Sequence, residues 1–517
     1  MDEVSPDKAK QRFDIADYAV CGAMLAVSVG IGVFYAIKGS KVNTTKEFLF
    51  GGKKMKVLPV ALSILATFLS AITLLGVPAE SYQFGLMYWM INISYCVMIP
   101  LSAHIYVPLF YKLQVSSVNE YLEKRYNKGV RLVCFIVSTI SQLIYTAFVI
   151  YAPSLVFSQV TGLDLWVCVL SMGLVCTFYT TIGGIKAVIW TDVFQALIIY
   201  GALITVIVKG TIDVGGLHEV WRKADMSQRT QFIDFNPDPT VRHTIWSLTI
   251  GGLFTWLSIY AVNQAMIQRS LTIPTLARAK AVIWLNLPGN ILTITLTIVA
   301  GLIIYANYST CDPITTKQIK SPNQILPFFV MDSLSLFPGL RGLFVSGIFS
   351  GALSTMSSTL NSLSANTLED LVKSYIATNM SELWATRTAK LLVDSCQTLY
   401  FNATKFMANI TSAATPVISL NDDVFVLYRL SYLWYSGIGC IIVIVIGLLV
   451  SLFIEIENNL WVRKSCNKSL ASIYLGWRVL ETLSLLQQHI IIVRISATHL
   501  TWSDKVIKLV DAGIIWG

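Results

Sequence analysis

The most informative feature of this sequence is how little charge it contains. Only 13% of its 517 residues are charged and 55% are hydrophobic, whereas soluble globular domains carry about 25% charged residues. A shortage this large excludes a soluble enzyme, because long segments must face something other than water. The net charge of +9 does not indicate nucleic-acid binding, since the basic residues lie in short loops between apolar segments.

Motifs of common enzymes and metal sites are also missing. The sequence has no Walker loop, no HExxH, no GxSxG and no Rossmann glycine pattern. Its nine cysteines are scattered, without a CxxC pair or a cluster with histidine, so a zinc site has no support. The first 13 residues are polar and the first apolar run is long enough to span a membrane, so we expect no cleavable signal peptide.

Long apolar segments are what the sequence has instead. A helix needs about 20 apolar residues to cross the hydrocarbon core, and backbone polar groups in lipid must be satisfied internally. The apolar segments do not alternate every second residue as barrel strands do, so we predict an all-α integral membrane protein. The predicted spans are 16–37, 57–80, 86–110, 131–157, 164–182, 187–208, 244–267, 282–306, 341–366 and 431–454.

Basic residues in alternate loops predict the orientation of these spans. The loops after the first, third and seventh spans carry lysines and arginines such as Lys53, Arg125 and Arg269. Loops of this kind stay in the cytoplasm. We therefore predict a multi-pass protein of the plasma membrane with an extracellular N-terminus, residues 1–15.

The segments predicted to be extracellular contain possible modification sites. Glycosylation sequons begin at Asn307, Asn402 and Asn409. Cys311 and Cys396 also lie in predicted extracellular loops, where an oxidising environment would allow them to form a disulfide.

The number of crossings is inconsistent in the last third of the chain. The ninth span must run toward the cytoplasm, and the last span is also followed by basic residues, so an odd number of crossings must separate them. The interval 374–430 has no apolar run of 20 residues and resembles an extracellular loop. Either an odd number of helices is missing between about 373 and 395, which we favour, or the last span is inverted. Residues 455–517 stay unassigned.

The second predicted span carries a regular pattern of hydroxyl side chains. They recur every three or four positions from Ser63 to Thr73, and Gly76 and Pro78 follow. A helix broken inside a membrane exposes carbonyls and amides that can hold ions. The alternative is a proline kink in a helix whose hydroxyls bond the carbonyl four residues earlier.

The ninth span is also rich in hydroxyls. Seven of them, together with Asn361, lie between positions 346 and 361. Hydroxyl and carbonyl oxygens are hard ligands that suit an alkali cation which must be released again. The same small residues would equally allow two helices to pack closely.

Three further polar residues in or near spans need partners. Asp192 follows the turn predicted at Gly183–Gly184 by about two turns of helix, and an acid inside a membrane is a functional candidate. The alternative is an acid placed near a helix N-terminus, where the helix dipole favours it. Asn263 and Gln264 either line a hydrophilic cavity or bond a neighbouring helix.

Several of these strings together resemble the sodium/solute symporter family, which includes carriers of sugars, iodide, biotin and pantothenate, and monocarboxylates. The similarity covers about residues 10–373 and 425–454 and is greatest to the branch of multivitamin, monocarboxylate and iodide carriers. The strings are Ser70–Glu80, Tyr145–Pro153, Phe178–Gln195, Trp256–Arg269 and Ser350–Asp370.

The resemblance implies a fold of two inverted repeats of five helices each. Residues 16–37 would then be a peripheral span, residues 57–208 repeat one, and residues 244–366 a partial repeat two. The family continues after the ninth span with about three more helices, whereas residues 374–430 look like the extracellular loop that normally follows them. Repeat two is therefore expected to be incomplete.

The resemblance also implies a set of site residues. Sodium would lie where the broken second span meets the ninth span, held by three main-chain carbonyls and two hydroxyls. These ligands are Ala66, Leu69, Gly351, Ser354 and Thr355. Asp192 and Gln195 would support cation coupling. The residues expected near the substrate are Thr73, Tyr145, Trp256 and Gln264.

These expectations predict a sodium-coupled secondary active symporter rather than an enzyme. It would import a small organic anion, a vitamin such as biotin or pantothenate or a monocarboxylate, across the plasma membrane. Its partners would be the sodium ion, the anion and the lipid bilayer, with no cofactor beyond sodium as coupling ion and no nucleic acid. The alternative is a truncated, transport-inactive membrane protein that binds or regulates a full-length partner.

Overall fold

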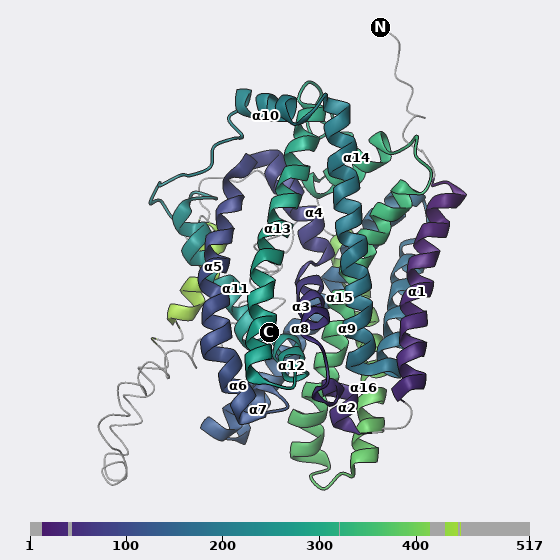
Figure 1. The fold of residues 1–517 in the computed structure, drawn as a ribbon, viewed down its shortest axis with the longest axis vertical. Coiled ribbons are helices and arrows are strands. Elements are labelled where there is room, and N and C mark those ends of the chain that lie inside the picture. The colour runs from purple at the N-terminus through teal and green to yellow at the C-terminus, as the bar shows by residue number, and fades with distance from the viewer. Residues whose placement is uncertain (1–12, 40–43, 320, 414–429, 443–444, 446–517) are drawn as a thin grey trace.

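The computed structural model describes residues 13–39, 44–319, 321–413, 430–442 and 445 (Figure 1). These residues form helices and no strand, which confirms the all-α prediction for this part of the chain. Six described helices are long and apolar enough to cross a membrane, or seven if one bent pair counts as a span. Most of the predicted last span, and the whole segment 455–517, lie outside the described residues.

The helices occur in the following order along the chain. The α-helices are α1 (Ile15–Gly39), α2 (Thr45–Phe50), α3 (Val57–Phe68), α4 (Ala71–Phe84), α5 (Ile91–Leu101), α6 (Val107–Leu113), α7 (Val118–Arg125), α8 (Lys128–Thr161), α9 (Leu165–Val214), α10 (Leu217–Met226), α11 (Gly252–Val262), α12 (Gln264–Leu271), α13 (Leu276–Tyr308), α14 (Ile325–Ser333), α15 (Leu340–Asn366) and α16 (Glu382–Ala413). Short 3-10 or π turns extend or join them at Gly51–Lys53, Gly85–Met90, Ser102–Tyr106, Ser247–Gly251, Pro322–Gln324 and Thr367–Ile376. A last described helix covers Tyr432–Ile442.

The long helix α9 is a hairpin of two spans. Gly184 interrupts it with φ 58° and ψ −158°, a conformation that a residue with a Cβ adopts only at a cost. Before the bend, the Tyr179 hydroxyl donates to the Leu353 carbonyl at 3.3 Å. After the bend, Asp192 accepts from Ser354 at 2.7 Å. Because Leu353 and Ser354 are adjacent on α15, the two halves of α9 lie side by side, with the turn at the predicted position.

Two other spans are broken near the middle of the bundle. α3 ends at Phe68, and Ser70 has an extended backbone and caps α4 through the Thr73 N–H. The break lies before Gly76 and Pro78, which are inside α4, so the structure has a broken helix and not only a proline kink. The second break falls at Asn263, where α11 and α12 meet at a bend of 53°.

The centre of the bundle is α15. In its most apolar stretch 94% of the residues are buried, and it packs against α1, α3, α8, α9 and α16 (Figure 1). A Cβ on Gly351 would lie 2.8 Å from the Leu69 carbonyl oxygen, closer than real Cβ atoms come to a neighbour. The small residues of the ninth span therefore do allow close helix packing, at the break between α3 and α4.

The segment predicted to be an extracellular loop forms a helix instead over residues 382–413. At its start, Glu382 accepts from the Thr45 N–H of α2 at 3.3 Å. Further on, Phe401 packs on Trp166 at the start of α9, with ring centroids 5.4 Å apart. α16 therefore crosses the bundle from the end with α2 to the end where α9 begins, and the loop prediction is wrong for these residues.

The physical reason for this error is the composition of α16. Its buried residues are small or are isolated apolar residues, and their spacing places them on one helical face. They are Ala385, Thr386, Ala389, Val393, Cys396 and Thr404. A search for about 20 consecutive apolar residues does not detect such a helix, because the other faces of α16 carry charged and polar side chains.

The position of α16 removes the inconsistency in the number of crossings. It returns the chain to the end that carries α10, and the chain is next described at that same end, where the Ser431 N–H donates to the Pro239 carbonyl at 2.9 Å. The helix Tyr432–Ile442 then packs on α11 through a 2.8 Å hydrogen bond from Thr255 to Ser436. The parity of the spans thus no longer requires a missing helix, and the incompleteness of repeat two stays a prediction.

Candidate functional site

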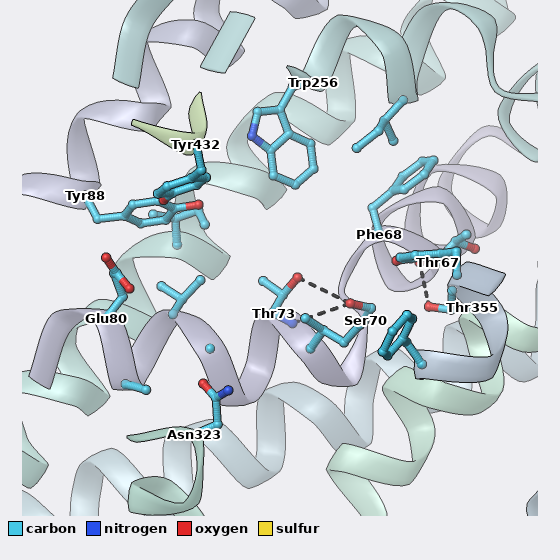
Figure 2. A pocket seen from close by; sticks show the side chains of 18 of the residues that line it. Thr67, Phe68, Ser70, Thr73, Glu80, Tyr88, Trp256, Asn323, Thr355 and Tyr432 are labelled. Carbon is cyan, nitrogen blue, oxygen red and sulfur yellow. Dashed lines mark hydrogen bonds between the residues drawn. The ribbon is translucent and has the colours of Figure 1, made fainter. Parts of the chain in front are cut away.

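A cavity of about 220 Å³ lies between the two broken helices. Figure 2 shows its two ends, with Thr67 and Thr355 on one side of Thr73 and Glu80, Tyr88 and Tyr432 on the other. We call the first the helix-break end, defined by Thr67, Ser70 and Thr355, and the second the charged end, defined by Glu80 and Arg242.

Three of the four residues predicted near the substrate line this cavity. They are Thr73, Tyr145 and Trp256. Gln264 does not line it, because its side chain accepts from the Val118 N–H and donates to the Ser116 carbonyl, both at 2.9 Å. Its neighbour Asn263 lines the cavity and caps α12. Asn263 therefore lines the cavity, whereas Gln264 bonds the neighbouring segment at the start of α7.

The predicted sodium ligands of α3 and α15 lie close together at the helix-break end. The Thr355 hydroxyl donates to the carbonyls of Thr67 at 2.8 Å and of Gly351 at 3.0 Å. The Leu69 carbonyl faces Gly351, and Ala66 is fully buried one residue before Thr67. Carbonyls at the end of a helix lack intrahelical partners, so the break supplies hard oxygen ligands beside those of α15.

Ser354 has a different environment from the other predicted ligands. Its hydroxyl donates to the carboxylate of Asp192 at 2.7 Å. A hydroxyl that donates its hydrogen keeps two lone pairs, so this bond is compatible with cation binding through the same oxygen. It also links the predicted ligand Ser354 directly to the residue predicted to support coupling.

Asp192 and Arg269 form a buried ion pair beneath this end of the cavity. Arg269 Nη2 lies 3.0 Å from Asp192 Oδ2, and the two side chains are 1% and 0% exposed. Ser63 of α3 bridges them, accepting from Arg269 Nε at 2.7 Å and donating to Asp192 at 2.5 Å. The pair therefore joins α9 and α12, and through Ser63 and Ser354 it also reaches α3 and α15.

The burial of Arg269 corrects the sequence analysis, which counted it as a cytoplasmic loop cation. A carboxylate inside a bundle requires a partner, and Arg269 is the cation that ends the seventh predicted span. Gln195 is fully buried one turn beyond Asp192, and its side-chain nitrogen and oxygen have no hydrogen-bond partner among the described residues. Its role in coupling stays a prediction.

At the charged end, Glu80 of α4 pairs with Arg242 from the segment between α10 and α11. Arg242 Nε donates to Glu80 Oε1 at 2.6 Å and Nη2 to Oε2 at 2.9 Å. His243 Nε2 lies 3.1 Å from Glu80 Oε1. Burial opposes the charge on Arg242, but the hydrogen bonds and charge of Glu80 prevail and raise the pKa of Arg242 above its usual value.

No sequence motif identifies this pair. Glu80 lies in one of the family strings, but no role was assigned to it, and Arg242 lies just before the seventh predicted span. The signal available was the acid at the very end of the second predicted span, because an acid near the membrane needs a partner. The sequence alone does not show which basic residue provides it.

The predicted modification sites have varied environments. The Asn307 side chain lies in α13 and donates to the carbonyls of Ile303 at 2.8 Å and Gly210 at 3.2 Å, so an attached glycan would have to break at least one of these bonds. Asn402 is exposed on α16. The side chain of Asn409 lies outside the described part of the structure. Glycosylation of all three stays a prediction.

The predicted disulfide does not form in the structure. Cys311 and Cys396 are both free thiols. Cys311 is exposed beyond the end of α13, whereas Cys396 is buried on the inner face of α16. The pairing assumed two extracellular loops, and it fails because Cys396 belongs to a helix packed on the bundle.

Two broken helices that meet a buried central helix around a cavity define a secondary transporter of the broken-helix type. The solved structure of an outward-open, substrate-bound Na⁺-coupled sialic acid symporter has this fold. It superposes with a TM-score of 0.74 and 22% sequence identity, over 93% of this chain and 98% of that one. A profile of the sodium:solute symporter family matches residues 48–430, and the chain belongs to this family.

Three named relatives show which transporters of this family the chain is similar to. The sodium-coupled monocarboxylate transporter 1 of Xenopus laevis is 40% identical over 455 residues, which are 87% of this chain and 73% of the relative. The sodium-coupled monocarboxylate transporter 2 of Mus musculus is 44% identical over 364 residues, 70% of this chain and 59% of the relative. A protein of Drosophila melanogaster named "Putative sodium-dependent multivitamin transporter" is 40% identical over 382 residues, 72% of this chain and 63% of the relative.

Membership in this family supports sodium-coupled symport of a small solute by a multi-pass membrane protein, with sodium as the coupling ion. The three relatives are all named as transporters. The aligned segments cover between 59% and 73% of the length of the three relatives described above.

Proposed function

We propose that this chain imports a small monocarboxylate together with sodium across the plasma membrane, with residues 1–15 outside. The observation that carries the proposal is the continuity of one cavity. It touches Thr355, a predicted sodium ligand, and also Thr73, Tyr145 and Trp256, the predicted substrate residues. Ion and substrate would therefore occupy neighbouring positions, where the binding of one can favour the binding of the other.

Sodium binding at the helix-break end would couple the ion to the arrangement of helices. The proposed ligands belong to α3 and its break, Ala66 and Leu69, and to α15, Gly351, Ser354 and Thr355. A cation that contacts both elements stabilises the arrangement in which they lie together. Asp192, bonded to Ser354, and Gln195 would support this site from α9.

The electrical driving force is adequate for uphill import. Moving one elementary charge through 100 mV releases about 2.3 kcal/mol. That corresponds to a concentration ratio of about 50 for each net charge that crosses with the substrate. The sodium concentration gradient adds to this.

The size of the cavity favours a monocarboxylate over a vitamin. Its volume of about 220 Å³ is below the range of about 300–1,000 Å³ usual for drug-sized ligands. The relatives from frog and mouse are also named as monocarboxylate transporters. The alternative of a transport-inactive membrane protein has no support from these relatives.

Uptake into cells tests the proposal. Cells that express this chain would receive radiolabelled L-lactate, biotin or pantothenate, with sodium or with choline in its place. We expect sodium-dependent uptake of lactate and much less of the two vitamins. Preferential sodium-dependent uptake of biotin would contradict the proposed substrate but support sodium-coupled symport.

The matched variants are Thr355→Ala and Thr297→Ala. Thr355 bonds the Thr67 carbonyl across the break, whereas Thr297 is a buried threonine of α13 that bonds only within its own helix. Loss of one ligand should raise the sodium concentration for half-maximal uptake by about tenfold, equivalent to about 1.4 kcal/mol. An unchanged sodium dependence in Thr355→Ala would refute the proposed ligand set.

A further inference from the structure

The cavity contains a single cation among the described residues that line it, Arg242, and a single anion, Glu80. The other lining residues are apolar, aromatic, hydroxyl or amide side chains. An organic anion in this cavity therefore has one positively charged side chain available among the described lining residues, and that side chain is already paired with a carboxylate of the protein.

Two hydrogen bonds to Glu80 occupy one edge of the Arg242 guanidinium group. Nε and Nη2 bind the two oxygens of Glu80. The guanidinium carbon lies 4.8 Å from the Phe84 ring centroid and 5.4 Å from that of Tyr432. The Ser431 hydroxyl donates to the Arg242 carbonyl at 2.7 Å. Backbone and side chain are thus held in place without Glu80.

The Glu80–Arg242 pair is also accessible. Its side chains are 16% and 33% exposed, in contrast to the completely enclosed pair of Asp192 and Arg269. A bidentate arginine–carboxylate pair is stronger than most surface ion pairs, so it opens only for a partner that replaces both of its hydrogen bonds. Glu80 would keep one partner after separation, because His243 Nε2 lies 3.1 Å from its Oε1.

We propose that Arg242 recognises the carboxylate of the substrate and that Glu80 occupies the same guanidinium edge when substrate is absent. A guanidinium binds carboxylates through two parallel hydrogen bonds, so the substrate carboxylate replaces the Glu80 carboxylate with the same geometry. This inference rests on the proposed function in one respect, that the solute is an anion. It makes Arg242 the residue that selects carboxylates over neutral analogues.

Three variants separate recognition by Arg242 from a purely structural pair. Arg242→Gln removes the partner of the substrate. Glu80→Gln removes the internal competitor. The charge swap Glu80→Arg with Arg242→Glu restores an ion pair but moves the cation to α4. Arg242→Lys is a fourth variant, for the case that the charge-swap variant does not fold. It keeps the positive charge but lacks the planar guanidinium group that binds a carboxylate through two hydrogen bonds.

The matched control is Arg229→Gln. Arg229 also belongs to the segment between α10 and α11 and also packs on an aromatic ring, 3.7 Å from the Tyr305 centroid. It donates to the Tyr82 carbonyl at 2.9 Å but does not line the cavity. Loss of this cation should leave substrate affinity unchanged.

The experiment measures equilibrium binding of radiolabelled L-lactate to the purified full chain in sodium, together with sodium-dependent uptake by cells. Competition with unlabelled lactamide reports carboxylate selectivity, and size-exclusion elution checks folding. We expect Arg242→Gln to raise the Kd for lactate at least tenfold and to abolish the preference over lactamide. Arg242→Lys should have an intermediate Kd. Glu80→Gln should lower the Kd severalfold, and the charge swap should not restore binding.

The proposal is overturned if the charge swap restores binding, or if Glu80→Gln weakens binding as much as Arg242→Gln does. Lactate binding that depends on Arg242 without any uptake would support the role of Arg242 in recognition and refute the proposed import. Uptake by Arg242→Gln with an unchanged KM for lactate would support the proposed import and refute the role of Arg242 in recognition. A wild-type chain that neither binds nor transports lactate refutes both.

Discussion

Two carboxylate–arginine pairs are similar in chemistry but differ in exposure: one is buried beneath the helix-break end of the cavity, and the other lines its charged end. Asp192 and Arg269 are 0% and 1% exposed, with a shortest contact of 3.0 Å. Glu80 and Arg242 are 16% and 33% exposed, with a shortest contact of 2.6 Å. The pair of Asp192 and Arg269, which we call the inner pair, has no access to solvent. The pair of Glu80 and Arg242, which we call the outer pair, borders the cavity that a solute must enter.

The difference in exposure implies different roles for the two pairs. Neither Asp192 nor Arg269 can lose its partner without leaving a buried charge, so this pair holds α9 to α12. Either member of the outer pair can be rehydrated when the pair opens, so its partners can exchange. The inner pair therefore maintains the helix arrangement around the proposed sodium site, and the outer pair is free to respond to the solute.

The largest expected effect is on stability, when one member of the inner pair is removed. Arg269→Met leaves Asp192 buried without its cation and should lower the free energy of unfolding by about 3–5 kcal/mol. The double variant Asp192→Asn with Arg269→Met should recover much of this loss, because no uncompensated charge remains. Thermal unfolding of the purified variants in detergent measures both effects. A single variant as stable as the double one would contradict the role assigned to the inner pair.

A smaller effect is expected at the contact between α15 and the helix break. Gly351→Ala places a methyl group 2.8 Å from the Leu69 carbonyl oxygen and should cost about 1–3 kcal/mol through overpacking. It should also raise the sodium concentration for half-maximal uptake. Gly201→Ala on α9 is the control, since a Cβ there meets no atom within 4 Å. Equal behaviour of the two variants would show that the helix break is not tightly packed.

Gln264→Ala should lower the free energy of unfolding by about 1 kcal/mol, the usual net contribution of a hydrogen bond. Gln264→Ala releases the segment before α7 from the start of α12, because the side chain bonds Ser116 and Val118. Stability should fall while the KM for lactate stays the same. A raised KM at unchanged stability would instead favour the cavity position that the sequence analysis expects for this residue.

The last effect completes the comparison of the two pairs. Glu80→Gln removes the anion of the outer pair and should lower the free energy of unfolding by less than Arg269→Met does, since Arg242 is partly exposed and keeps its contacts with Phe84 and Tyr432. The same thermal-unfolding assay as for Arg269→Met measures it. A loss as large as that of the inner-pair variant would mean that the outer pair is structural and does not exchange.

The parts of the site that sequence could predict are those with a local signature. Thr73, Tyr145 and Trp256 line the cavity as expected, because each belongs to a contiguous family string. The turn at Gly184 and the hydroxyl pattern around Thr67 are likewise local features. They depend on neighbours in the chain, not on distant contacts.

The parts that sequence could not predict depend on partners far apart in the chain. Arg269 resembles any basic residue at the end of a span until the fold places it 3.0 Å from Asp192. Arg242 and Glu80 are 162 positions apart. α16 lacks a long apolar run, and only its packing against α8, α9 and α15 explains why such a helix is stable there.

The central claim is that this chain by itself couples sodium to the import of a monocarboxylate. The most direct test is reconstitution of the purified chain, with no other protein, into liposomes, followed by L-lactate uptake under an inward sodium gradient. Our account predicts transient accumulation of lactate above its external concentration, which disappears when choline replaces sodium and is reduced in Thr355→Ala. Correctly inserted protein that gives no sodium-driven uptake would contradict it and would leave a family member that does not transport lactate by itself.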